Sequence, residues 1–128
     1  MSYYFNKTVK MSFESTITRV TEELKREGFG ILTEIDVRET LKKKLGVDFR
    51  PYKILGACNP PFAYQALQTE DKIGLMLPCN VIIQEISKGV VEVAAIDPSA
   101  SMKGIDNPEL VKIAEQVREK LNKVVANL

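Results

Sequence analysis

Residues 81–96 read VIIQEISKGVVEVAAI, two runs rich in valine and isoleucine on either side of Lys88-Gly89. β-Branched residues favour strands, and a short glycine-containing turn between two such runs predicts a β-hairpin. The hairpin decides the fold class, because its two strands pair antiparallel. A parallel α/β sheet is the alternative, but the residues from Asp97 onward lack the further strand that it needs.

Strand patterns recur upstream of the hairpin. β-Favouring runs predict strands over residues 3–10, 29–35 and 50–58, the last with a bulge or close packing at Gly56. Residues 97–101, Asp-Pro-Ser-Ala-Ser, have the composition of a loop.

Four helices are predicted between and after these strands. Their expected N-caps are Ser12, Asp36 (with Glu39 completing a capping box), Asn59 before Pro60, and Asn107 before Pro108. Gly28 and Gly46 end the first two helices. The stripes predicted to be buried are Phe13, Ile17, Val20 and Leu24; Val37, Leu41 and Leu45; Phe62, Ala63, Ala66 and Leu67; and Leu110, Ile113, Ala114, Val117, Leu121, Val124 and Val125.

The charged residues of these helices are expected to face solvent. On the first helix they include Glu22, Glu23 and Glu27. The three lysines at residues 42–44 are interpreted as offsetting the negative end of the dipole of the second helix. Phosphate binding by these lysines is the less favoured interpretation. The whole pattern predicts an α+β fold, with an antiparallel-rich sheet covered by helices in a single domain over residues 1–128.

Composition excludes several classes of function. The 128 residues are 45% hydrophobic and 27% charged with a net charge of +1, which is typical of a globular domain and argues against nucleic acid as a partner. The sequence contains no histidine, so Ser-His-Asp triads, Cys-His dyads, His-based zinc sites and His-ligated haem are excluded within one chain. Neither a signal peptide at residues 1–7 nor a membrane span is expected, and we predict a cytoplasmic protein.

The cysteines are the best candidates for chemistry, because neither phosphate-binding glycine motif nor a distinctive carboxylate pair occurs. Cys58 lies between a predicted strand and the cap of a predicted helix, where free backbone N–H groups and the helix dipole would favour a thiolate. Cys79 follows Pro78 at the entry to another strand, and both cysteines precede asparagine, in Cys58-Asn59 and Cys79-Asn80. If the two strands are neighbours, both thiols could reach one rim of the sheet.

Three hypotheses remain open for these thiols. In the first, Cys58 and Cys79 line a pocket for a small ligand, or bind a soft metal such as Cu(I). In the second, Cys58 is the nucleophile and Cys79 the resolving thiol of a redox protein or enzyme. In the third, both are buried and inert, and the protein is structural or interacts through its surface. The separation and burial of the two thiols discriminate between them.

Three phrases carry a resemblance that covers nearly the whole chain: YKILGACNP at 52–60, LPCNV at 77–81 and DPSASM at 97–102. On these the sequence resembles the DUF302 family, a domain of unknown function. The resemblance implies an α+β domain similar to the TATA-binding-protein-like (helix-grip-like) fold, often as a homodimer, and it implies no established activity or cofactor. It draws attention to Cys58, Asn59, Pro60, Pro78 and Cys79 as the family's characteristic positions.

Overall fold

The elements of the chain follow the predicted order closely. The structure is a computed structural model that describes residues 2–128. Its elements are β1 (Tyr4–Val9), α1 (Phe13–Arg26), β2 (Gly30–Asp36), α2 (Val37–Leu45), β3 (Tyr52–Cys58), α3 (Pro60–Thr69), the 3-10 helix η1 (Asp71–Met76), β4 (Cys79–Ser87), β5 (Val90–Ile96), α4 (Pro98–Ser101) and α5 (Pro108–Ala126).

All five strands form one antiparallel sheet in the order β1-β5-β4-β3-β2. The predicted hairpin is confirmed as β4 and β5, with Gly89 at φ +76° in the turn between them. An α+β domain is therefore confirmed, and the parallel alternative is wrong. The arrangement is consistent with the finer prediction of a TATA-binding-protein-like fold without establishing it.

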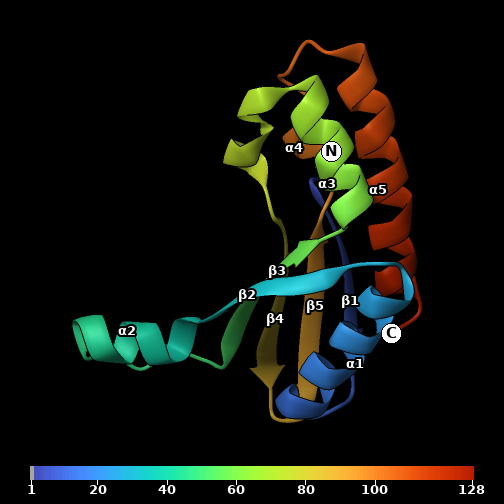
Figure 1. Cartoon of the computed structure of the whole chain (residues 1–128). Coiled ribbons are helices and arrows are strands. Elements are labelled where there is room, and N and C mark those ends of the chain that lie inside the picture. The colour runs from blue at the N-terminus through green and yellow to red at the C-terminus, as the bar shows by residue number, and fades with distance from the viewer. Residues whose placement is uncertain (1) are drawn as a thin grey trace.

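Two helices cover one face of the sheet and form the main core (Figure 1). Val20 and Leu24 of α1 and Leu121 of α5 are fully buried against sheet residues such as Leu55 and Val93. A second, smaller core lies beyond the end of the sheet, where α3, η1 and the first half of α5 meet; its members are Ala66, Ile73, Met102, Leu110 and Ala114. The two cores together frame the space described below as the candidate site.

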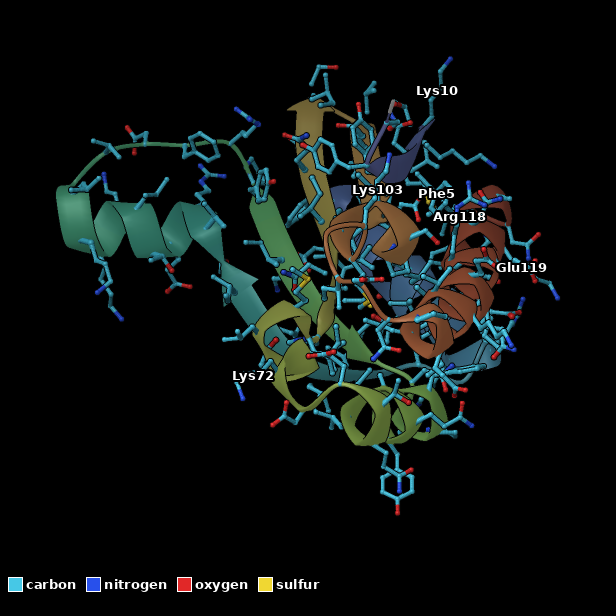
Figure 2. All side chains as sticks on the ribbon, turned by 90° about the horizontal axis from the view of Figure 1, so that it is seen from above. Phe5, Lys10, Lys72, Lys103, Arg118 and Glu119 are labelled. Atoms are coloured by element: carbon cyan, nitrogen blue, oxygen red, sulfur yellow. The ribbon has the colours of Figure 1, made fainter. Side chains whose placement is uncertain are left out.

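Helix α2 departs from prediction, because it projects away from the body of the molecule (Figures 1 and 2). Its stripe was expected to be buried, yet Leu45 is 69% exposed, and Val37 and Leu41 are only half-buried. The helix begins and ends as predicted, with Asp36 accepting from the Glu39 N–H and Gly46 in the left-handed conformation. Periodicity identifies the apolar face of a helix, but not whether the chain supplies a surface to cover it.

Two further predictions are corrected by tertiary contacts. Glu23 of α1, expected in solvent, is buried and accepts from Arg19 and Arg26, and Glu27 is shielded by Lys120 and Lys123 of α5. Residues 97–101 are not a loop: Asp97 accepts from the Ser99 N–H and caps the short helix α4. Helix α5 packs against both α1 and α4.

Candidate functional site

A cavity of about 320 Å³ opens where the two cores meet. The residues that line it come from the ends of β3 and β4, from α3 and the segment after it, from α4 and α5, and from β2 and the residue just before it. The wall is almost entirely apolar; its larger members are Phe29, Leu32, Phe62, Leu67, Leu77, Met102, Leu110, Ile113 and Val117. Because most of the wall is hydrocarbon, the cavity offers an environment suited to an uncharged molecule.

Both cysteines lie in the wall of this cavity. Strands β3 and β4 are neighbours, as the prediction required. Cys79 pairs with Ala57, and Ala57 directly precedes Cys58. Neither cysteine forms a disulfide; Cys58 is partly exposed and Cys79 only 7% exposed. The fold thus brings together two thiols separated by 20 intervening residues in the sequence, and places them beside one space.

The other predicted site residues divide between the cavity and its outside. Asn59 and Pro78 line the cavity with the cysteines. Pro60 is exposed at the start of α3 and does not line it. Asn80 lies in a separate hollow on the uncovered face of the sheet, together with Tyr4 and Tyr52. The alternation of side chains along a strand places Cys79 and Asn80 on opposite faces.

Burial keeps one of the two thiols protonated. Burial, with a smaller contribution from the charge of Cys58, raises the pKa of Cys79 from its usual 9.0 to about 11. At neutral pH, Cys79 is therefore a thiol and not a thiolate.

The start of α3 does not provide the cluster of N–H groups predicted to face Cys58. Pro60 and Pro61 occupy its first two positions, and proline has no N–H. The backbone amide of Ala63, two residues after Pro61, donates to the Asn59 carbonyl at 2.9 Å. The Asn59 side chain does not cap the helix either, because its Nδ2 donates to the Glu27 carbonyl at 3.0 Å. Asn59 therefore occupies the N-cap position, as predicted, but its side chain ties α3 to the end of α1 and does not cap the helix.

Close packing at Gly56, as the sequence predicted, holds one wall of the cavity in place. A Cβ built at Gly56 would lie 2.7 Å from Pro78 Cγ and would collide with Thr33 Oγ1. The bulge lies on the partner strand, in β2 between Ile31 and Thr33. Without a side chain at Gly56, Pro78 sits directly on the sheet just before Cys79.

An ion pair at the end of β5 positions another part of the wall. Arg118 of α5 donates from Nε to Asp97 Oδ2 at 3.1 Å, and its guanidinium lies 5.1 Å from the centre of the Phe5 ring. Phe5 and Arg118 lie next to each other in Figure 2. Asp97 also caps α4, so this contact fixes α4, and with it Pro98 and Met102 of the cavity wall, against α5.

Sequence reasoning missed most of the apolar wall. Leu77 and Met102 stand in segments without a regular apolar pattern. One available signal was the length of the α5 stripe: it starts at Leu110, well before the part of α5 that covers the sheet, and its first turns line the cavity.

Two absences apply to residues 2–128. Within that range no three or more His, Cys, Asp or Glu residues gather into a group that could hold a metal ion. Over the same range, none of the helices combines the length and the apolar character needed to cross a membrane.

Comparisons with known proteins agree with the fold and with the family resemblance. No curated protein matches the sequence. A crystal structure titled "uncharacterized conserved protein DUF302 from Bacillus stearothermophilus" superimposes with a TM-score of 0.90 and 30% sequence identity, and the match covers 98% of each chain. Residues 5–128 match the family described as "Domain of unknown function DUF302". The chain belongs to the DUF302 family.

Proposed function

We propose that this protein binds a small, uncharged, apolar molecule in the cavity beside Cys58 and Cys79. The observation that carries the proposal is an open cavity of about 320 Å³ whose lining contains no charged side chain among the residues described. Ligand pockets begin at about 300 Å³ and are mainly apolar, with a few polar groups that orient the ligand. Asn59 and the two thiols are the polar groups here.

The cavity also favours ligand binding over inert thiols. A purely structural core packs to near-crystalline density and leaves few spaces larger than a water molecule. In this chain the space is connected to solvent beside exposed apolar side chains, of which Leu32 is 65% and Leu67 45% exposed. Apolar surface at the mouth of an apolar cavity suits the entry of an apolar ligand.

The electrostatics weigh against the two other roles for the thiols. A resolving thiol attacks as a thiolate, and a pKa of about 11 leaves ~0.01% of Cys79 in that form at pH 7. A soft metal would have to displace the same tightly held proton. Stoichiometric Cu(I) uptake that is lost in a Cys58→Ser/Cys79→Ser variant would restore the metal hypothesis.

We also propose that the protein is a homodimer, in a cytoplasmic setting that keeps both thiols reduced. The arm, α2 with the following residues to Arg50, supports this. It projects from the body (Figure 2), and its apolar side chains Leu45 and Val47 are 69% and 45% exposed. In a two-fold dimer the same patch is buried on both copies, so one contact covers the exposed apolar side chains of both arms.

Filling the cavity tests the ligand proposal. Ala63 is half-buried in the wall, so the ring in Ala63→Phe should occupy ligand space and weaken binding of the neutral probe N-phenyl-1-naphthylamine about tenfold. Fluorescence titration of the full chain measures the affinity. Gln65→Phe adds the same ring on the same helix outside this cavity, and should leave the affinity unchanged. Equal affinities in all three proteins, or no binding to the wild type, would refute the proposal.

A charge on the arm tests the homodimer. Leu45→Glu should convert a dimer to a monomer, because it would bury carboxylates in an apolar contact. Sedimentation equilibrium gives the mass directly. Leu75→Glu is the matched control, since Leu75 is 86% exposed on η1 and lies away from the arm. A monomeric wild type, or a dimer that survives Leu45→Glu, would count against the arm as the interface.

A further inference from the structure

Sulfur is the only nucleophilic side-chain atom in the wall of the cavity, as far as the described chain shows. The lining residues include no Ser, Thr, Lys, Tyr, Asp or Glu, and Asn59 is their only other strongly polar side chain. The site therefore has no carboxylate base to activate water. Of the sulfur atoms in the wall, only the thiols of Cys58 and Cys79 can lose a proton and form a neutral adduct with a bound apolar molecule.

The two thiols differ in accessibility. Cys58 is partly exposed, so its sulfur is within reach of a molecule in the cavity. Cys79 is 7% exposed, and burial, with a smaller contribution from the Cys58 charge, raises its pKa to about 11, so it keeps its proton at neutral pH. Because Cys58 is the more exposed of the two and lines the cavity, its sulfur is the nucleophile of the pair.

We propose, on the basis of the ligand proposal above, that the cavity takes apolar α,β-unsaturated carbonyl compounds and that Cys58 Sγ captures them covalently. The step balances without a co-reactant. A carbon–sulfur bond forms between Cys58 Sγ and the β-carbon, and the carbon–carbon π bond breaks. The thiol proton lost by Cys58 is returned by solvent to the α-carbon. Nothing leaves, and nothing is oxidised or reduced.

This class of electrophile fits the site better than those that need a leaving group or hydrolysis. A conjugated carbonyl is uncharged, so it enters an apolar wall without losing hydration of a charge. Its β-carbon is a soft electrophile, which suits sulfur. A thioether is not hydrolysed, and the lining has no basic side chain to remove the α-proton and reverse the addition, so the adduct persists and the reaction is a stoichiometric capture. Holding the compound beside Sγ raises its effective concentration, which accelerates addition relative to a free thiol.

Competition between an apolar and a polar electrophile provides the test. Intact-mass spectrometry of the full chain follows adduct formation with benzylideneacetone, a neutral apolar enone, and with iodoacetamide. For each thiol we take the ratio of the rate of reaction with the enone to the rate with iodoacetamide. We expect this ratio to be about ten times larger for the protein than for N-acetylcysteine. The adduct should add the whole mass of the enone, should be lost in Cys58→Ser, and should persist in Cys79→Ser.

The cavity-filling variant separates capture in the cavity from ordinary thiol reactivity. Ala63→Phe should remove the enone preference, while Gln65→Phe should keep it. A wild-type ratio equal to that of N-acetylcysteine, or labelling of Cys79 instead of Cys58, would overturn the inference. If the naphthylamine probe still binds the wild type in that case, the ligand proposal stands and only the covalent capture is wrong. If the probe does not bind either, both are wrong.

Discussion

Replacing Gly56 by alanine should lower the free energy of unfolding by about 3 kcal/mol, which is the upper end of the range for inserting a methyl group into a packed site. The new Cβ would meet Pro78 Cγ at 2.7 Å and would collide with Thr33 Oγ1. The proline ring is closed and cannot rotate out of the way. Either β3 must separate from its neighbours, or Pro78 must move into the cavity.

Gly30→Ala is the matched control for this prediction. Gly30 is also a strand glycine, but a Cβ there meets nothing within 4 Å and its φ is not positive. Alanine at this position should be neutral or should stabilise by about 0.5 kcal/mol, because it restricts the unfolded chain. Urea unfolding measures both variants. A Gly56→Ala protein as stable as Gly30→Ala would mean that Pro78 is not held against the sheet.

Raising the pH from 9 to 11 should lower the free energy of unfolding of the wild-type protein. The decrease should be about 2 kcal/mol larger than in a Cys79→Ala variant. The pKa of Cys79 is raised in the folded state to about 11 from its usual 9.0. Between these values the unfolded chain has lost the proton that the folded chain retains. The stabilisation from this group is therefore complete below pH 9 and is lost as the pH rises through about 11.

The comparison with Cys79→Ala is needed because tyrosines and lysines titrate in the same range. Those groups are present in both proteins, so the difference between the two pH profiles belongs to Cys79. In a Cys58→Ser background the difference should shrink without disappearing, since burial is the larger cause of the raised pKa and the Cys58 charge the smaller. Parallel pH profiles for wild type and Cys79→Ala would show that the Cys79 sulfur is solvated.

The local predictions succeeded where the relevant physics acts within a few residues. Ser12, Asp36 and Asn107 cap their helices through the expected backbone N–H groups, because a cap needs only the next turn of the chain. Asn59 also occupies the N-cap position of its helix, but its side chain makes no capping hydrogen bond. Its amide found a better partner in the Glu27 carbonyl, 32 residues away, and no local pattern could identify that partner.

The candidate site divides in the same way. The sequence identified the cysteines because the chain has few thiols and both stand in distinctive motifs. It also predicted that they lie near each other if their two strands are neighbours, and the strands are adjacent in the sheet. The apolar wall could not be identified, because Leu77 and Met102 resemble any other core residue until the fold leaves a space beside them. The identity of an apolar residue does not indicate whether its side chain packs against another side chain or lines a cavity.

The sequence by itself determined the antiparallel hairpin and the order of the five strands and four longer helices, because turn chemistry and hydrophobic period act over short distances; three short motifs indicated the family. Only the tertiary structure decided that α2 leaves its apolar stripe uncovered, that Glu23 is buried, and that Cys79 keeps its proton beside a partly exposed Cys58. Burial is a property of what the rest of the chain places around a residue, so it is known only once segments distant in sequence have packed together.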